Sequence, residues 1–275
     1  MDTLTFTPLG HATVLIELGS LRIITDPVFS ERVGFKLGPW IFGPKRTIPP
    51  AIHLKELPPI DVILLSHSHY DHTDAPSLKK LPKESIAIVQ KGNADLVKRF
   101  PDRRALSWWE TTHVEKEGAP KLKVTAIPSN HWGARNLVDQ WRRWGGFLLE
   151  FPDIPSPHHP SQPLSVCFAG DTANTEKYKK VHSFRKEAPI DVAIMPIGAY
   201  DPWSVNHCTP EEAWRMGIDD LKSTHFLPIH YGTFPISAEP IEEPMQRLLA
   251  FAEEHGCADK IVAAQHGATF SLPLK

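Results

Sequence analysis

Cysteine is scarce in this chain of 275 residues, which contains only Cys167, Cys208 and Cys257. The three residues are far apart, and no two of them form a C-x-x-C pair. This spacing excludes a disulfide framework and a structural zinc site made of thiolates. We therefore expect all three thiols to be reduced.

The sequence also lacks an excess of charge of either sign. It has 30 Lys and Arg residues against 32 Asp and Glu residues, a formal net charge of −2. Such a chain offers no basic field that could hold a polyanion, so nucleic acid is not an expected partner.

Long apolar runs are absent as well. No stretch approaches the ~18 apolar residues that a membrane-spanning helix needs. The first residues contain no cationic stretch followed by an apolar segment, which a secretory signal would require. We expect a cytoplasmic protein whose contact with a membrane, where there is any, is peripheral.

Short β-branched and apolar runs recur along the chain between turn-forming residues. Their length and flanks predict strands at residues 13–16, 21–24, 62–65, 86–89, 122–125, 147–149, 166–168, 192–195 and 261–263. Helical patterns lie between some of these strands. Their alternation, without a linker-like change of composition, predicts one α/β domain over residues 1–275.

Two helices have clear boundary signals. Thr209 and Glu212 form a capping box around Pro210, which suits the first helical position. A second helix is predicted from about Pro244 to a stop at Gly256. Residues 26–59 and 151–163, by contrast, are predicted to be irregular, and long irregular segments are often functional.

The 15 histidines are plentiful, and their positions carry the functional prediction. His67, His69, Asp71 and His72 form an H-x-H-x-D-H motif directly after the apolar run 62–65. Residues two apart in an extended segment point the same way, so His67 and His69 can present two imidazoles to one metal ion. Asp71 and His72, as the chain turns, can face a second ion. A ligand set without cysteine favours a catalytic site over a closed structural one.

Three further candidate ligands follow other predicted strands. His131, Asp171 and His230 each stand just beyond an apolar run, where the ligands of α/β proteins gather. The alternatives are ordinary: a lone histidine at a strand end is often a hydrogen-bonded surface or core residue, and Gly170-Asp171 is also a simple turn. The motif at residues 67–72 favours ligand roles for all three.

Together these residues resemble the pattern of the metallo-β-lactamase superfamily. Within it, the chain resembles the branch that contains N-acyl-phosphatidylethanolamine-hydrolysing phospholipase D. The closer resemblance rests on segments 25–30, 43–46, 130–132, 168–172, 196–202, 207–213 and 230–234. It implies an αβ/βα sandwich, in which two packed β-sheets are flanked by helices.

The resemblance also implies a dinuclear metal site. His67, His69 and His131 would hold one ion, Asp71, His72 and His230 the other, and Asp171 would bridge the two. The expected ions are two divalent metals, zinc first, with manganese or iron as alternatives.

The expected activity is metal-dependent hydrolysis by a hydroxide that bridges the ions. A phosphodiesterase of phospholipase D type is expected, acting on a lipid-like or other small phosphodiester. A lactonase or other ester hydrolase is the alternative, because the same ions also serve acyl centres. A regulatory module that binds metal without catalysis is disfavoured, since every position of the dinuclear set is filled.

Catalytic roles are predicted for Asp71, Asp171 and His207. His207 precedes the helix at Pro210, whose amino-terminal end favours an anion, so it is a candidate phosphate contact or general acid. The alternative is a histidine that bonds locally at the helix start.

Three other polar residues lie beside predicted strand ends. Asp26 either orients a metal-binding histidine or forms an Asp-Pro turn. Supporting or structural roles are predicted for His11 and His266.

Aromatic and basic side chains alternate between Phe29 and Arg46. This tract either cradles an amphipathic anion or touches a membrane, or else it wraps the core. A similar patch with the same two interpretations contains Trp132, Trp141, Trp144, Arg142 and Arg143.

Overall fold

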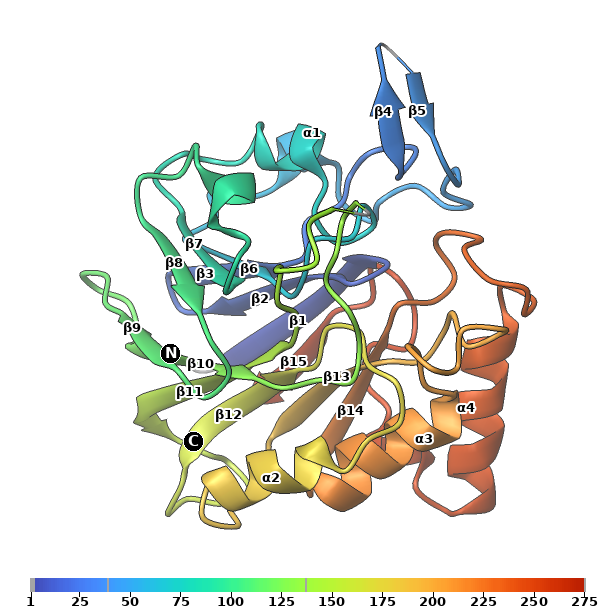
Figure 1. The fold of residues 1–275 in the computed structure, drawn as a ribbon. Coiled ribbons are helices and arrows are strands. Elements are labelled where there is room, and N and C mark those ends of the chain that lie inside the picture. The colour runs from blue at the N-terminus through green and yellow to red at the C-terminus, as the bar shows by residue number, and fades with distance from the viewer. Residues whose placement is uncertain (1–2, 39, 137, 275) are drawn as a thin grey trace.

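Two β-sheets stacked face to face form the centre of the molecule (Figure 1). The computed structural model describes residues 3–38, 40–136 and 138–274. Side chains from both sheets interdigitate between them, including Phe6 and Val62 from one sheet and Phe147 and Val166 from the other. This buried layer is the main hydrophobic core.

The first sheet has the strand order β15-β1-β2-β3-β6-β7-β8. Its strands are β1 (Thr3–Gly10), β2 (Thr13–Leu18), β3 (Leu21–Thr25), β6 (Val62–Leu65), β7 (Ile86–Gln90), β8 (Arg103–Leu106) and β15 (Phe270–Pro273). The run from β3 to β8 is parallel, whereas β15, β1, β2 and β3 pair antiparallel. Every residue of β6 is buried, as is typical of a parallel strand covered on both faces.

The second sheet has the strand order β14-β13-β12-β11-β10-β9. Its strands are β9 (Thr111–Val114), β10 (Leu122–Ile127), β11 (Gly146–Pro155), β12 (Pro163–Phe168), β13 (Val192–Pro196) and β14 (His225–Ile229). Strands β12, β13 and β14 are parallel to one another. The carboxyl ends of β12 and β14 therefore lie at the same edge of this sheet.

Helices cover the outer face of each sheet (Figure 1). The second sheet is covered by α2 (Lys177–Phe184), α3 (Pro210–Trp214), which continues as a π-helix (Arg215–Asp220), and α4 (Glu243–Glu254). The first sheet is covered by α1 (Ala75–Leu78) and by 3-10 helices at Leu54–Glu56 and Ala94–Val97, and a further 3-10 turn lies at Ala258–Lys260. This layering confirms the predicted αβ/βα sandwich. No helix in the described ranges is long and apolar enough to cross a membrane.

Both predicted helix boundaries are confirmed. The Thr209 hydroxyl accepts a hydrogen bond from the Glu212 amide, and the Glu212 side chain accepts one from the Thr209 amide, as the capping box requires. The other helix, α4, ends at Glu254, and Gly256 follows with a φ of +64°. That left-handed conformation suits glycine at the end of a helix.

One prediction about local structure is wrong, and two are wrong in part. Residues 261–263 form no strand, because Ile261 makes only an isolated bridge to Phe226. Residues 151–163 are irregular only between 156 and 162, since β11 runs on to Pro155 and pairs with Pro163, the first residue of β12, across a register shift. The irregular segment 26–59 contains a hairpin of β4 (Phe35–Leu37) and β5 (Trp40–Phe42), which projects from the body of the molecule (Figure 1).

Candidate metal centre

The side chains of the predicted site meet where strands of both sheets end. The H-x-H-x-D-H motif follows β6 in the first sheet, whereas His131, Asp171 and His230 follow β10, β12 and β14 in the second. The structure brings all seven predicted ligand residues into one cluster, in which His69 and Asp71 are partly exposed and the other five residues are buried. Their roles as ligands stay a prediction.

One group consists of His67, His69 and His131. The Nε2 atom of His67 lies 2.9 Å from Nδ1 of His69, which in turn lies 3.3 Å from Nε2 of His131. Three ring nitrogens thus converge on one point from three directions. Burial lowers the pKa of all three imidazoles below its ordinary value, so the rings are neutral near pH 7.

Neighbouring groups determine which nitrogen of two of these rings carries the proton. Nδ1 of His67 lies 2.9 Å from the Ser66 hydroxyl, and Nδ1 of His131 lies 2.9 Å from the Asn206 carbonyl oxygen. A carbonyl only accepts, so His131 donates from Nδ1 and its Nε2 keeps a free lone pair. The Ser66 hydroxyl donates to Asp26, which leaves its oxygen to accept from His67 in the same way.

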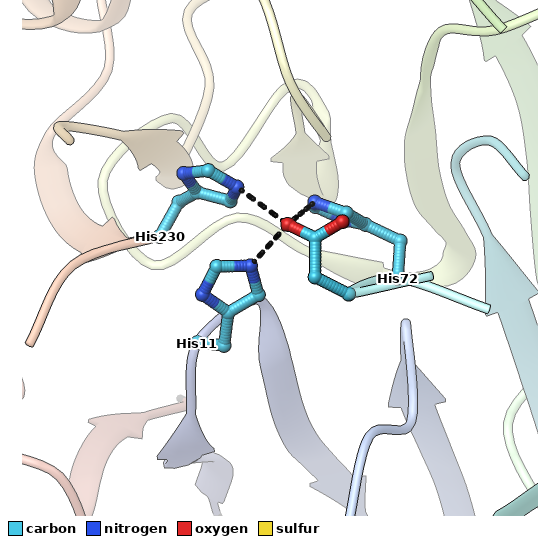
Figure 2. A group of neighbouring side chains, drawn as sticks. His11, His72 and His230 are labelled. Atoms are coloured by element: carbon cyan, nitrogen blue, oxygen red, sulfur yellow. Dashed lines mark hydrogen bonds and ion pairs between the residues drawn. The ribbon is translucent and has the colours of Figure 1, made fainter. Parts of the chain in front are cut away.

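The second group consists of Asp71, His72 and His230, together with His11. Figure 2 shows the three imidazoles directed toward one another, and Oδ2 of Asp71 lies 2.9 Å from Nε2 of His11. The same oxygen lies 3.4 Å from Nε2 of His230 and 3.6 Å from Nε2 of His72. This arrangement gives a second convergence of imidazole and carboxylate atoms.

Asp171 lies between the two groups. Its Oδ2 atom is 3.1 Å from Nε2 of His72 and 3.2 Å from Nε2 of His230. The same atom is 3.8 Å from Nε2 of His67 and 3.8 Å from Nε2 of His131. One carboxylate oxygen is thus within reach of nitrogen atoms from both groups, which is the position that a bridging ligand needs.

The carboxylates and the imidazoles of this centre stabilise each other's charge. Burial opposes the charged form of His230, but Asp171 and Asp71 outweigh it and raise the pKa of His230 to about 9. Burial likewise opposes ionisation of Asp171, yet His230 and His72 hold the pKa of that carboxyl well below its usual range. The Asp171 carboxylate is therefore ionised near pH 7, and a carboxylate in this form can bind a cation.

The polar atoms that face the centre fit divalent metal ions. Nε2 of His72, Nε2 of His230 and Oδ1 of Asp171 are buried, and none of them has a hydrogen-bond partner among the described residues. Buried polar atoms without partners are costly, so such a concentration in one place needs an explanation. Imidazole nitrogens and carboxylate oxygens at these positions form a donor set suited to zinc and similar ions.

Asp26 contacts His72 directly and is linked to His67 through Ser66. Its carboxylate accepts hydrogen bonds from the Ser66 amide at 2.8 Å and from the Ser66 hydroxyl at 2.5 Å. Nδ1 of His72 lies 2.7 Å from Oδ2 of the same carboxylate. Of the two interpretations of Asp26, the structure favours the one in which it orients a histidine of the cluster.

His207 stands at the edge of the cluster, in the wall of a cleft of about 440 Å³. Its Nδ1 atom lies 3.8 Å from Oδ2 of Asp171, and burial lowers the pKa of its imidazole to about 4. His69, Asp71 and Asp171 line the same cleft. His207 therefore lies where it could contact a substrate in the cleft, as its predicted role requires.

The second group includes one residue outside the seven predicted ligands. His11 joins this group through the 2.9 Å contact of its Nε2 with Oδ2 of Asp71, a contact that is compatible with the supporting role predicted for it. The local signal for His11 was its place directly after β1, beside Gly10. That signal did not indicate a contact with Asp71, which is 60 positions away in the sequence. His266, in contrast, packs on Tyr231 with ring centroids 5.1 Å apart and belongs to none of the candidate metal groups in the described part of the chain.

The aromatic side chains between Phe29 and Arg46 divide into two kinds. Phe35, Trp40 and Phe42 of the hairpin are 55%, 70% and 59% exposed, so they do not wrap the core. Phe29 is partly buried and packs against the core of the first sheet. Trp132 and Trp141 of the second patch are also exposed, whereas Trp144 is half-buried and stacks edge-on with Trp108.

Comparison with known proteins identifies the family. A model described as the beta-lactamase superfamily domain matches residues 21–231. The chain therefore belongs to the metallo-β-lactamase superfamily, as its motifs predicted.

Among its relatives, the chain is 31% identical over 256 residues to N-acyl-phosphatidylethanolamine-hydrolyzing phospholipase D 1 of Caenorhabditis elegans, covering 87% of this chain and 67% of that protein. It is 32% identical over 269 residues to the mitochondrial enzyme of that name from Saccharomyces cerevisiae, covering 95% of this chain and 54% of that protein. It is 33% identical over 256 residues to the uncharacterized protein Rv0906 of Mycobacterium tuberculosis, covering 90% of this chain and 63% of that protein. The chain thus spans between 54% and 67% of the length of these relatives.

Solved structures show the same fold. The isothiocyanate hydrolase from Delia radicum gut bacteria superposes with a TM-score of 0.72 at 18% identity, covering 98% of this chain and 99% of that one. Igni18, a metallo hydrolase from Ignicoccus hospitalis, gives a TM-score of 0.69 at 20% identity, covering 99% of this chain and 100% of that one. At these identities the likeness concerns the fold alone.

Proposed function

We propose that this protein is a metal-dependent hydrolase that cleaves phosphodiesters with a lipid-like part, in the manner of a phospholipase D. The observation that carries the proposal is the position of Asp171, whose Oδ2 lies between two groups of imidazole nitrogens at the floor of an open cleft. Relatives at 31% and 32% identity are named for hydrolysis of a phospholipid.

Two divalent ions would be held as the sequence predicted, one by His67, His69 and His131, the other by Asp71, His72 and His230, with Asp171 between them. When bound, such a pair supplies Lewis acidity that lowers the pKa of a water molecule and stabilises charge on the attacked phosphoryl oxygen. Zinc fits the donor set, and manganese or iron are the alternatives.

The protein's own residues supply position and proton control. Ser66 and the Asn206 carbonyl fix the protonated nitrogen of His67 and His131, and Asp26 does the same for His72. His207 lines the cleft within 3.8 Å of Asp171, where it can contact a phosphate oxygen or the leaving group of the substrate.

The surroundings of the cleft support an amphiphilic substrate. The exposed side chains of Trp132 and Trp203 line it, and so do Val33, Gly34 and Pro44, which flank the projecting hairpin. Exposed aromatic rings next to a reactive centre suit a molecule with a polar head and apolar chains, presented singly or at a membrane surface.

Initial rates on three substrates would test the proposal at equal metal loading. A short soluble phosphodiester and a dispersed N-acyl phospholipid are expected to be hydrolysed, and a lactone much more slowly. The variant Asp171→Ala is the control for activity from contaminants. Faster turnover of the lactone would replace the proposal by the alternative ester hydrolase, and no turnover of any of the three would refute hydrolysis of these bonds.

A further inference from the structure

A guanidinium group lines the cleft of the metal centre. Arg135 contributes it, and Tyr70 and His207 line the same cleft. The acidic residues among the described lining are Asp71 and Asp171, both of which are proposed metal ligands. Arg135 is therefore the one permanent cation among the described lining residues, and it takes no part in holding the ions.

One end of this guanidinium is held by the loop that carries the ligand motif. Nη1 of Arg135 donates to the Ser68 carbonyl oxygen at 2.5 Å and to the Thr73 carbonyl oxygen at 3.0 Å. The guanidinium carbon lies over the Tyr70 ring, 3.9 Å from its centroid. Nη1 carries two hydrogens, so these two carbonyl groups occupy both of them. The contacts fix the orientation of the charged group beside the ligand histidines.

The other edge of the guanidinium is free. The side-chain hydrogen bonds that Arg135 makes to described residues come from Nη1, and Nε and Nη2 make none. Neither Nε nor Nη2 is among the polar atoms of the described chain that are closed to solvent without a partner. These two nitrogens form the edge with which arginine binds two oxygens of an acidic group side by side. Arg135 thus presents an oriented pair of donors at the cleft.

The charge of Arg135 is not neutralised by direct contact with a carboxylate among the described residues. Asp139, four positions further along the chain, pairs with Arg142 at 2.7 Å. Oδ2 of Asp74, which follows the loop, accepts hydrogen bonds from two serine residues. A partly buried guanidinium without a paired anion costs free energy, and an anionic ligand in the cleft would offset that cost.

The place of Arg135 bears on which substrates the cleft accepts. Ser68, which anchors the guanidinium, stands between the proposed ligands His67 and His69. A phosphodiester group carries a negative charge at neutral pH, whereas a lactone or another carboxylic ester carries none. A fixed cation with two free donors beside the metal centre therefore favours the phosphodiester.

We propose that Arg135 determines specificity for anionic substrates, by donating from Nε and Nη2 to the negatively charged oxygens of a phosphodiester in the cleft. The inference rests on the proposed function, because it assigns a contact to the substrate proposed there. Arg135 exchanges no proton and forms no covalent bond in this role. It binds the substrate's charge, and the metal centre performs the hydrolysis.

Equilibrium binding tests this role without requiring turnover. Isothermal titration of the zinc-loaded protein would compare diethyl phosphate, which is an anion, with triethyl phosphate, which has the same phosphoryl group and no charge. The two ligands would be titrated into the wild type and into Arg135→Ala. Elemental analysis of each protein would report its zinc content.

Arg99 provides a matched control. Its Nη1 donates to the Leu78 and Leu81 carbonyl oxygens at 2.8 and 2.6 Å, and its guanidinium carbon lies 5.1 Å from the centroid of the Phe100 ring. Arg99 does not line the cleft. Arg99→Ala therefore removes one positive charge and the same kinds of contact at a distance from the proposed substrate.

Arg135→Ala is expected to bind diethyl phosphate about 10-fold more weakly than the wild type and triethyl phosphate within about 2-fold, with unchanged zinc content. Arg99→Ala is expected to bind both ligands as the wild type does. If Arg135→Ala does not fold, Arg135→Gln is compared in the same way, since its amide can still donate to a carbonyl group of the loop.

Three results would overturn the proposal. Equal binding of diethyl phosphate by the variant and the wild type would show that Arg135 does not contact the anion. Equal losses for both ligands, or a loss of zinc, would show that Arg135 only supports the loop. No binding of diethyl phosphate by the wild type at millimolar concentration would remove the ligand itself.

The outcome is separable from that of the rate measurements. Charge-dependent binding through Arg135 in a protein that hydrolyses no phosphodiester would refute the proposed function and leave the assignment of Arg135 in place. Hydrolysis of phosphodiesters with unchanged binding in the Arg135 variant would do the opposite.

Discussion

Replacing Asp26 by asparagine is the sharpest test of how the metal centre is organised. The carboxylate accepts from the Ser66 amide, the Ser66 hydroxyl and Nδ1 of His72. An asparagine that still accepts from the Ser66 amide must turn its NH₂ group toward the other two atoms. His72 can then accept at Nδ1 only by moving its proton to Nε2.

The relocated proton is expected to weaken metal binding. Nε2 of His72 is the atom 3.1 Å from Oδ2 of Asp171, so its lone pair is the one that faces the proposed ion. Changing a carboxylate that orients a ligand histidine typically costs about 10- to 100-fold in metal affinity. Losing a hydrogen bond to a charged group should also lower the free energy of unfolding of the metal-free protein by about 2 kcal/mol.

A second buried aspartate provides a matched control. Asp191 is fully buried and accepts from the Ser165 amide at 2.8 Å, the Ser165 hydroxyl at 3.1 Å and the Ser156 hydroxyl at 2.5 Å. It stands just before β13, at the end of the sheet opposite the metal centre. Asp191→Asn should therefore destabilise the fold to a similar extent while leaving metal affinity unchanged.

Competition with a fluorescent zinc chelator would measure affinity, and urea unfolding of the metal-free proteins would measure stability. The reasoning requires a loss of zinc affinity in Asp26→Asn that Asp191→Asn does not share. Wild-type affinity in Asp26→Asn would refute the assigned orientation of His72. Equal losses in both variants would show that stability alone governs metal binding.

Three further predictions concern the centre and its surroundings. Elemental analysis of the purified protein should approach two divalent ions per chain, and a maximum of one after reconstitution with zinc, manganese and iron would contradict the dinuclear proposal. Asp171→Ala should lose both metal and activity, whereas His207→Ala should keep its metal and lose turnover; loss of metal from His207→Ala would make it a ligand instead. Replacing Phe35, Trp40 and Phe42 of the hairpin by serine should lower kcat/KM for a long-chain phospholipid by about 10-fold and spare a short phosphodiester, because these exposed rings can bury substrate methylenes worth roughly 0.8 kcal/mol each. Equal losses on both substrates would show that the rings support the fold.

The motif of the centre was predictable because its geometry is local. His67 and His69 are two positions apart after a buried strand, and an extended backbone points both side chains the same way. Local pattern was not enough to predict that His131, Asp171 and His230 of the second sheet join this motif. Each follows a strand, and only the resemblance to a known superfamily indicated which strand ends meet.

His11 shows where local pattern fails. Its contact with Asp71 joins residues 60 positions apart, and it depends on how β1 turns into β2 at Gly10. His11 has a φ of +55°. Its amide donates to the Thr233 hydroxyl, and its carbonyl oxygen accepts from the His230 amide. These tertiary constraints leave no trace in the spacing of residues near position 11.

The segment between Phe29 and Arg46 shows a different limit. Its aromatic and basic residues form one pattern in the sequence, but in the structure some of these side chains are exposed and others are buried. Lys45 and Arg46 are neighbours in an extended stretch, so their side chains point to opposite sides. Lys45 has a side chain that is 56% exposed, whereas Arg46 is 8% exposed. The exposed aromatic rings belong to the hairpin beside the cleft, whereas the buried guanidinium donates to the Val28 carbonyl oxygen and lies over the Phe234 ring. Substitutions of the exposed hairpin rings should therefore alter the choice of substrate, whereas substitutions of Arg46 should instead lower the stability of the fold.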